Sequence, residues 1–454
     1  MDVITIETPS LGDRSYVVHD GEVALVVDPQ RDVDRVLAAA EEAGVRITHV
    51  AETHVHNDYV SGGLVLSRMT GADHVHAAAE PLRFDHRPVA DGDTFAVGSL
   101  AVEVVHTPGH TPEHLSYVVR ADGSPPAAFT GGSLLYGTVG RTDLISEDMT
   151  DELTRAQHRS AHRLAEMLPD ETRIYPTHGF GSFCASASSD EESDGTLACE
   201  KEINLALTVD DEDAFVERLV EGLTAYPRYY AQMGPMNLAG GVPVDLSPPA
   251  PVDPIELGRR IHRGEWVVDL RDRKAFAADH LAGTVGIQLE DQFVTYLGWL
   301  IPWATPVTLL GDSEDEVAEA QRQMVRIGID RPAGAATGPG PQSWAPDHER
   351  RSYPTVTFED VARRDSGTVL DVRRYDECEA GHIEGAVHIP IDEILQRLDD
   401  VPADTVWVHC ASGFRASIAA SLLDRAGKDV VLIDDEYENA AKAGLEEVEG
   451  ACRP

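Results

Sequence analysis

A repeated motif in the second half of the chain limits the possible folds more than any other feature of the sequence. The stretch VVDLRDRKAFAADHLAGTVGI is similar to TVLDVRRYDECEAGHIEGAVHIP further along. Four residues of the first stretch recur 102 positions later: Asp269, Arg271, His280 and Gly283 match Asp371, Arg373, His382 and Gly385. Because four matches at one offset are improbable by chance, the sequence predicts a duplicated domain.

Each copy alternates apolar β-branched runs with helical stretches. WVVDL at 266–270 and TVLDV at 368–372 open the two copies, and VWVHC at 406–410 is followed by ASIAASLLDRAG at 416–427. Strands that alternate with helices are typical of a parallel α/β sheet. We therefore expect both copies to be α/β domains with parallel sheets.

The first part of the chain has more strands and fewer helices. Apolar runs predict strands within 3–8, 15–20, 23–29, 47–54, 95–109, 114–120, 127–135 and 172–178. A helix is expected over 33–44, where Gly44 provides the C-terminal stop. Many strands with helices between them indicate a two-sheet α/β sandwich.

Two Pro-rich stretches, 242–254 and 331–347, are predicted to be linkers, because Pro and Gly disfavour helices and strands. They divide the 454 residues into domains at 1–245, 252–335 and 350–454. Three domains agree with a prior of roughly 150 residues per domain.

The chain is strongly acidic. It has 37 Lys and Arg residues and 79 Asp and Glu residues, so the formal net charge is −42. This charge argues against a nucleic acid or an anionic membrane as a partner. Lysine is confined to Lys201, Lys274, Lys428 and Lys442. We expect a halophile's protein that needs high salt, with an ordinary acidic mesophile protein as the alternative.

The N-terminus MDVITIETPSLGDRSYVV lacks the basic and apolar regions of a signal peptide. No apolar run reaches the length of about 18 residues that a membrane span needs. Five cysteines, an odd and sparse set, do not suggest a disulfide framework. A cytoplasmic location is expected.

A set of histidines follows the predicted strands of the first segment. His54, His56 and Asp58 alternate in THVHNDY, so their side chains can point the same way. His110 in TPGHTPEH and His178 in YPTHG follow later strands. Three neutral imidazoles can bind a metal and leave one position open, so we predict a metal site. An ordinary structural role is expected for the other histidines considered, His74, His76, His86, His158 and His162.

This pattern resembles the metallo-β-lactamase superfamily, in its persulfide dioxygenase and glyoxalase II branch. THVHNDY, TPGHTPEH, FTGGSLL, VGRTDL and YPTHG occur in the family's order over nearly all of the first segment. The resemblance implies an αββα sandwich with one divalent metal on His54, His56 and His110. It leaves Asp58 and His178 for a second metal or for support of the first. The resemblance favours Fe(II), and three histidines also suit Zn(II).

Two positions depart from the family pattern. Tyr59 stands where the family has a His, and Gly132 stands where it has an Asp that ligates metal. These departures favour a one-metal centre and leave open whether the domain is catalytic.

Arg141 and Tyr59 are candidate substrate-binding residues. Arg141 could hold a substrate carboxylate in bidentate fashion, and a structural ion pair with Asp143 is equally expected. Cys184 is expected to be an inert buried thiol, with a role beside the metal as the less favoured alternative.

The last segment carries a reactive thiol loop, HCASGFRAS. Cys410 lies between a strand and a helix, so backbone N–H groups and the helix N-terminus can surround its sulfur. Arg415 adds a positive charge, and Gly413 permits the tight curl. These features favour a thiolate or a persulfide at Cys410.

The loop and its upstream signature resemble the rhodanese family over about residues 355–445. The resemblance implies that Cys410 accepts sulfane sulfur, that Arg415 and Ser417 belong to the loop, and that Asp371 and Arg373 support it. The earlier copy has Gly311 and Glu316 in place of Cys410 and Arg415. We therefore expect an inactive rhodanese-like domain that spaces or braces the others.

Three functions remain in competition. The first is a fusion enzyme that oxidises low-molecular-weight persulfides with O₂ and transfers sulfane sulfur through Cys410. The second is a Zn-dependent, thioesterase-like hydrolase, and the third is a vestigial metal domain joined to an active rhodanese. The expected partners are a thiol persulfide, thiosulfate or sulfite, with a homo-oligomer as a further possibility.

Overall fold

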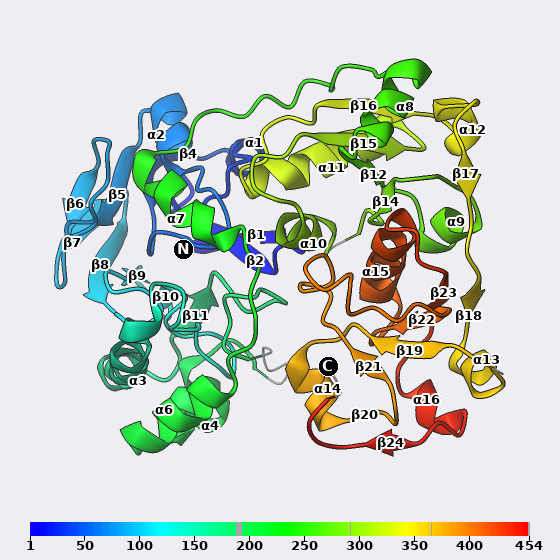
Figure 1. The fold of residues 1–454 in the computed structure, drawn as a ribbon. Coiled ribbons are helices and arrows are strands. Elements are labelled where there is room, and N and C mark those ends of the chain that lie inside the picture. The colour runs from blue at the N-terminus through cyan, green and yellow to red at the C-terminus, as the bar shows by residue number, and fades with distance from the viewer. Residues whose placement is uncertain (188–192, 291, 365, 453–454) are drawn as a thin grey trace. The chain divides into compact units, whose positions relative to one another are not determined.

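A computed structural model describes residues 1–187, 193–290, 292–364 and 366–452. The chain divides into two compact units (Figure 1). The first comprises Met1–Val244 with Val325–Gly328, and the second comprises Asp245–Met324 with Ile329–Pro454. Each unit is described by itself below.

Two sheets form the centre of the first unit. One has the strand order β1-β2-β3-β4-β5-β6 and the other the order β11-β10-β9-β8-β7. The strands β3 to β6 pair in parallel, as do β10 and β11, and the other pairs are antiparallel. The bounds are β1 Asp2–Thr8, β2 Asp13–His19, β3 Val23–Val27, β4 Arg46–Ala51, β5 Asp73–Ala77, β6 Arg87–Val89, β7 Thr94–Val97, β8 Leu100–His106, β9 Leu115–Arg120, β10 Ala127–Gly131 and β11 Arg173–Pro176.

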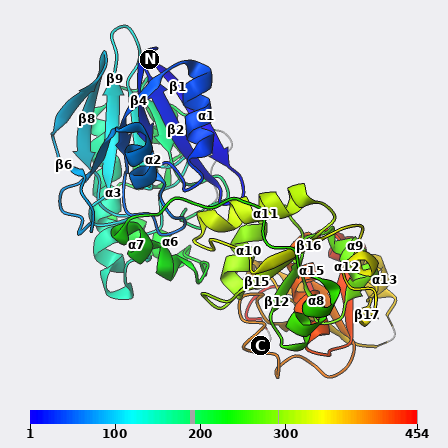
Figure 2. The same ribbon diagram turned by 90° about the horizontal axis from the view of Figure 1, so that it is seen from above.

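Helices cover the outer faces of these sheets. The helices are α1 Asp34–Ala43, α2 Gly63–Thr70, η1 Glu147–Met149, α3 Thr150–Met167, α4 Leu197–Ile203, α5 Leu205–Thr208, α6 Glu212–Glu221 and α7 Tyr230–Ala239. Apolar residues of α1 and α2 pack on the first sheet, and those of α3 and α6 pack on the second (Figure 2). A third cluster, which includes Leu25 and Phe129, fills the space between the sheets. The four layers make the αββα sandwich that the sequence predicts.

The second unit contains two parallel sheets. Their strand orders are β14-β12-β15-β16 and β18-β23-β22-β19-β21. The elements up to Trp344 are α8 Pro254–His262, β12 Trp266–Asp269, α9 Arg273–Ala278, β13 His280–Leu281, β14 Val285–Gly286, α10 Phe293–Leu300, β15 Val307–Gly311, α11 Glu314–Arg326, β16 Gly334–Thr337 and α12 Pro341–Trp344. They are followed by β17 Arg350–Arg351, β18 Thr355–Val356, α13 Phe358–Ala362, β19 Thr368–Asp371, α14 Tyr375–Ala380, β20 His382–Ile383, β21 Val387–His388, β22 Val406–His409, α15 Phe414–Arg425, β23 Val430–Ile433, α16 Asn439–Lys442 and β24 Glu447–Val448.

The predicted duplication is confirmed at the level of single hydrogen bonds. Arg271 binds the carboxylate of Asp269 and the carbonyl of Asp279, and Arg373 binds Asp371 and the carbonyl of Gly381 in the same way. The strand order β14-β12-β15-β16 corresponds to β21-β19-β22-β23. The two copies are therefore the same α/β design.

The linker predicted at 331–347 is wrong. Gly334–Thr337 forms β16, which pairs in parallel with β15, and Trp344 is buried. Pro and Gly discourage a helix here, but they do not prevent an edge strand that a neighbouring strand can complete. The stretch completes the first copy instead of separating the two.

Candidate functional site

The predicted metal ligands lie together at one end of the first unit's sheets. His54 and His56 follow β4, His110 lies between β8 and β9, and His178 follows β11. All four side chains are buried. The rings of His54, His110 and His178 lie 4.8–5.3 Å apart, measured between centroids. The fold thus brings together histidines that are more than a hundred residues apart in the sequence.

Each of these three rings is oriented by a bond at its Nδ1 atom. His110 Nδ1 donates to the carbonyl of Arg141 at 2.7 Å. His178 Nδ1 lies 2.9 Å from Asp13 and 3.2 Å from Asp58, and His54 Nδ1 lies 2.9 Å from the hydroxyl of Thr53. Partners of this kind orient metal-binding imidazoles in proteins. They leave the Nε2 atom of each ring for a metal.

The Nε2 atoms themselves fit one ion. Those of His54 and His178 lie 3.3 Å apart. Two nitrogens that each bind zinc at about 2.0–2.1 Å with tetrahedral angles would lie about 3.4 Å apart. His110 Nε2 is buried without a hydrogen-bond partner in the described part of the chain. Ligand atoms of His54, His56 and His178 all lie within 4.8 Å of one another, so this set of imidazoles fits a divalent metal.

The electrostatics of the pocket also suit a cation. Burial lowers the pKa of His110 to about 3 and that of His54 well below its usual value, so both rings are neutral. Burial opposes a charge on His178, but Asp58 and Asp13 outweigh it and raise its pKa to about 10. The carboxylates around His178 thus favour a positive charge at this position, which a metal ion would also supply.

The two ring nitrogens of His56 have different surroundings, and its Nδ1 is buried without a hydrogen-bond partner among the described residues, so this atom remains available to a metal. Its ring lies 4.1 Å from that of His54, and it shares a candidate metal-ligand group with His54 and His178. Its Nε2, however, faces the carboxylates of Asp28 and Glu52, each at 3.3 Å. The structure therefore adds His178 to the set of His54, His56 and His110, and places Asp58 beside His178.

The two departures from the family pattern have direct structural consequences. A Cβ atom at Gly132 would lie 2.3 Å from Cδ2 of His110, so no side chain fits there. The Gly132 N–H donates instead to Nε2 of His114, a buried histidine that the sequence analysis did not single out. Tyr59 stacks on His56 at 4.3 Å between centroids, and its hydroxyl lies 3.0 Å from His56 Nε2.

Arg141 is buried and bound within the protein. Its guanidinium donates two hydrogen bonds of 2.7 Å to Asp143 and a third to the carbonyl of Thr224. These contacts match the structural alternative given above for Arg141. Cys184 is also buried, and burial raises the pKa of its thiol, which favours the protonated form.

The thiol loop of the second unit has the geometry of an anion site. Cys410 follows β22, and the N–H of Gly413 donates to its sulfur at 3.2 Å. Gly413 has φ 92°, and the helix α15 begins at the next residue. Backbone N–H groups and a helix N-terminus stabilise negative charge on a sulfur placed there. The Ser417 hydroxyl donates to the carbonyl of Phe414 and secures the first turn.

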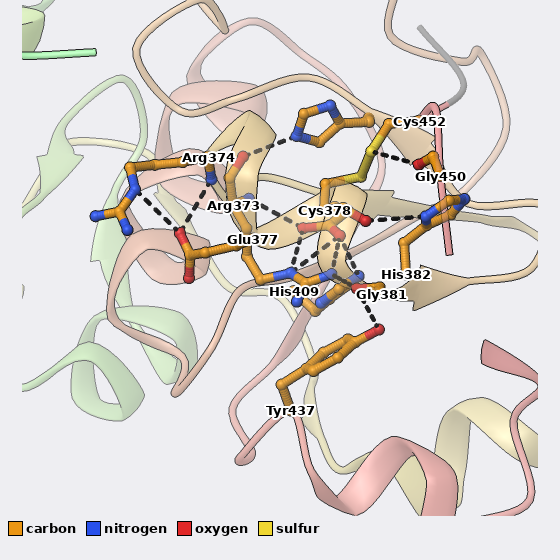
Figure 3. Close-up of a disulfide and its surroundings, with 12 residues drawn as sticks. Arg373, Arg374, Glu377, Cys378, Gly381, His382, His409, Tyr437, Gly450 and Cys452 are labelled. Atoms are coloured by element: carbon orange, nitrogen blue, oxygen red, sulfur yellow. Dashed lines mark hydrogen bonds and ion pairs between the residues drawn. A yellow bond between two sulfur atoms is a disulfide. The ribbon is translucent and has the colours of Figure 1, made fainter. Parts of the chain in front are cut away.

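Arg415 is held by a carboxylate outside the loop. Glu377 of α14 accepts a hydrogen bond of 2.7 Å from its guanidinium. Beside α14, Arg373 binds Asp371 and lies 3.7 Å from the centre of the Tyr437 ring (Figure 3). Asp371 and Arg373 thus support the chain around the loop without reaching Cys410 through any of these contacts.

The first copy contacts the loop that carries Cys410. Its own loop has Gly311 at the end of β15, and Glu316 accepts a hydrogen bond from the N–H of Asp312. From its helix α9, Arg273 donates to Asp434 at 2.7 Å and to the carbonyl of Ser412 at 3.4 Å. These bonds join the first copy to the Cys410 loop and to the strand end beside it, and a bracing role for this copy stays a prediction.

A disulfide joins Cys378 of α14 to Cys452 near the C-terminus (Figure 3). Their Cα atoms lie 6.2 Å apart although 74 positions separate them in the sequence. The odd and sparse set of cysteines does not suggest a disulfide framework, and this bond depends on a contact that only the folded domain provides. It lies next to Glu377, the residue that holds Arg415.

Two family models match the chain, one over the range that contains the histidine cluster and one over the range that contains Cys410. The metallo-beta-lactamase superfamily matches residues 13–178, and the rhodanese-like domain matches residues 358–443. None of the helices in the described ranges is long and apolar enough to cross a membrane.

The proteins similar to this chain include persulfide dioxygenases and hydroxyacylglutathione hydrolases. The human persulfide dioxygenase ETHE1, mitochondrial, is 30% identical over 200 residues, which cover 43% of this chain and 73% of that protein. The hydroxyacylglutathione hydrolase of Nitrosococcus oceani is 31% identical over 229 residues, 45% of this chain and 83% of that one. A crystal structure of a metallo-beta-lactamase from Staphylococcus aureus has a TM-score of 0.66 at 27% identity and covers 74% of this chain and 99% of its own. The chain therefore belongs to the metallo-beta-lactamase superfamily, among relatives that include persulfide dioxygenases and hydroxyacylglutathione hydrolases, and it also carries a rhodanese-like domain.

Proposed function

We propose that this chain oxidises low-molecular-weight persulfides with O₂ in its first unit and transfers sulfane sulfur through Cys410 in its second. The observation that carries the proposal is the pairing of a buried three-imidazole pocket with a thiolate-type loop in one chain. Linking the two sites raises the local concentration of an intermediate that both use.

In the first reaction, a persulfide, O₂ and water would give a thiol and sulfite. His54, His110 and His178, with His56 beside them, would hold the metal, and a bound Fe(II) would supply the position where the persulfide sulfur meets O₂. Arg141, Thr53 and the Asp13–Asp58 pair keep the imidazoles oriented. Burial of the pocket excludes bulk water from the labile sulfur.

In the second reaction, the thiolate of Cys410 would attack the outer sulfur of thiosulfate or of a persulfide. The S–S bond of the donor breaks, sulfite or a thiolate leaves, and Cys410 becomes a persulfide. An acceptor thiolate or sulfite then removes the outer sulfur and restores Cys410. The N–H of Gly413 and the N-terminus of α15 would stabilise the sulfur anion in both steps.

Oxygen consumption tests the first reaction. The full chain would carry the Cys410→Ser substitution, so that only the first unit acts. It would be loaded anaerobically with Fe(II) and supplied with glutathione persulfide in molar KCl. Uptake that disappears in His54→Ala is the expected result, because that substitution removes a ligand. Cys199→Ser, which lies outside both sites, is the matched control for the cysteine substitution.

No uptake by the iron-loaded chain would overturn the oxygenase proposal. A second candidate is hydrolysis of a glutathione thioester, which the similarity to hydroxyacylglutathione hydrolase favours. Thioester cleavage by the zinc-loaded chain, lost in His110→Ala, would identify it. Sulfur transfer that needs only Cys410, with neither metal reaction, would indicate a vestigial metal domain.

A further inference from the structure

One arginine of the first copy reaches both the Cys410 loop and a buried carboxylate beside it. Arg273 is the first residue of α9, and both copies belong to the same compact unit. Its Nε atom donates to Asp434 at 2.7 Å, and its Nη2 atom donates to the carbonyl of Ser412 at 3.4 Å. Ser412 lies two residues after Cys410, so the second bond is made to the loop itself.

The peptide group between Ser412 and Gly413 connects Arg273 to the sulfur of Cys410. Its carbonyl oxygen accepts the hydrogen bond from Arg273, and its N–H donates to Sγ of Cys410 at 3.2 Å. These two atoms form the negative and the positive end of one peptide dipole. Because hydrogen bonds in a chain polarise one another, a cation at the oxygen strengthens the N–H that faces the sulfur. The contact therefore favours a negative charge on Cys410.

Asp434 explains why a cation is needed at this place. It follows β23, and its side chain is only 3% exposed. A Cβ atom at Gly413 would lie 2.0 Å from Oδ1 of Asp434, so the carboxylate packs directly against the loop. A buried carboxylate there would oppose an anionic sulfur on Cys410. Arg273, and Lys274 with its Nζ 3.0 Å from Oδ2, pair with this carboxylate and offset its charge.

The first copy also holds Arg273 in position. The Arg273 backbone N–H donates to Oε1 of Gln288 at 3.1 Å, and its Nη1 donates to the same oxygen at 3.4 Å. Arg415, the cation of the loop itself, is paired with Glu377. Among the described residues, both cations paired with Asp434 come from the first copy. The charge balance beneath the loop is therefore completed by the copy that lacks a cysteine.

We infer that Arg273 is a positioning residue for sulfur transfer at Cys410. It fixes and polarises the Ser412–Gly413 peptide and offsets the charge of Asp434, so that a thiolate or a persulfide anion is stable on Cys410. The inference rests on the sulfur transfer proposed above and deepens it. It gives the first copy a part in the chemistry of the second.

Alkylation of Cys410 by iodoacetamide tests the inference without requiring sulfur transfer. The thiolate forms a carbon–sulfur bond and iodide leaves, and peptide mass spectrometry separates Cys410 from the other cysteines. In full-length Arg273→Gln, the pH of half-maximal alkylation should rise by about one pH unit, which makes the rate about tenfold lower below the native midpoint. Arg263→Gln is the matched control, since Arg263 belongs to the same copy and pairs with Glu256 and Glu265. It should keep the native midpoint.

Two further variants separate charge from structure. Asp434→Asn combined with Arg273→Gln should return the midpoint part of the way to the native value, because the opposing carboxylate is gone. Arg273→Lys keeps the charge but not the forked reach to Ser412, and it should give a smaller rise than Arg273→Gln. It tests the site even if Arg273→Gln fails to fold, which circular dichroism would reveal. A native midpoint in every folded Arg273 variant would overturn the inference.

Sulfur transfer from thiosulfate provides a separate measurement. If the native chain forms a persulfide at Cys410, Arg273→Gln should form it about tenfold more slowly below the native midpoint, because less thiolate is present. A native chain that forms no persulfide would overturn the proposed sulfur transfer. The alkylation midpoints would still decide whether Arg273 stabilises the anion at Cys410, so the two failures are distinguishable.

Discussion

At the scale of single residues, Gly132 and Tyr59 alter the packing of the predicted metal centre. Gly132 leaves space for a neighbouring ring, and Tyr59 fills space beside His56. The ring of His110 lies where a side chain at 132 would begin. Tyr59 covers His56 and contacts its Nε2. At both positions the packing of the pocket therefore differs from what the family pattern implies. The His110 ring occupies the space beside Gly132, and the Tyr59 ring packs against His56.

Gly132→Asp should accordingly fail to restore a carboxylate ligand. The new side chain must displace His110, so we expect the substitution to lower the metal bound per chain. Gly132→Ala, which adds the same Cβ atom without a charge, should show a similar loss. Metal analysis of the purified variants checks this, and an additional bound ion in Gly132→Asp alone would contradict it.

An ion pair joins Arg415 of the thiol loop to Glu377 of α14. Glu377→Gln would replace a charge-assisted bond, worth about 1.5–3 kcal/mol, with a neutral one. If this bond orients Arg415 in the transition state, sulfur transfer from thiosulfate should slow by about 10- to 100-fold. Glu379→Gln, an exposed position on the same helix, is the control and should keep the native rate. Equal rates for the two variants would remove Glu377 from the mechanism.

At the scale of elements, the second unit is built from two copies of one strand-and-helix pattern. The sequence predicts β12, β19, β22 and α15 correctly because each has an apolar or helical run of its own. It misses β16, whose residues are Gly, Ala and Thr. That strand forms because β15 offers it a row of hydrogen bonds, which no local pattern reveals.

The Cys378–Cys452 disulfide ties the C-terminal segment to α14. Closing a loop of 74 positions restricts the unfolded chain, and loop-closure entropy puts the stabilisation at no more than about 4.5 kcal/mol. Cys452→Ser should therefore lower the free energy of unfolding of an oxidised sample, with Cys199→Ser as the unaffected control. Urea unfolding measures this. Adding a reductant should remove the difference between Cys452→Ser and the native chain, and a difference that persists would exclude the disulfide as its cause.

At the scale of the whole molecule, the dominant property is a net charge of −42. Ion pairs use many of the basic residues, among them the pairs of Arg155 and Arg163 with surface carboxylates. The excess of acid remains and opposes the compact state through self-repulsion. Salt weakens this repulsion, since the screening length falls from about 10 Å at 0.1 M to about 3 Å at 1 M.

Stability should consequently rise with KCl concentration. We expect the midpoint of thermal unfolding to increase steeply between 0.1 and 1 M, because screening is nearly complete by then, and to level off above that. Scanning calorimetry over a KCl series measures it. An unchanged or falling midpoint would favour the alternative of an ordinary acidic protein.

The sequence by itself determined the αββα and parallel α/β folds, the duplication, the Cys410 loop and the histidines that are predicted to bind a metal. These depend on local features, namely apolar periodicity, turn residues and short motifs, which act in the same way wherever the chain places them. The tertiary structure decided which atoms meet. It oriented His110 through the carbonyl of Arg141, turned Nε2 of His56 toward Asp28 and Glu52, and placed Nε2 of His74 3.8 Å from Glu52. Such contacts join strands far apart in the chain, and they follow from packing that no local sequence pattern encodes.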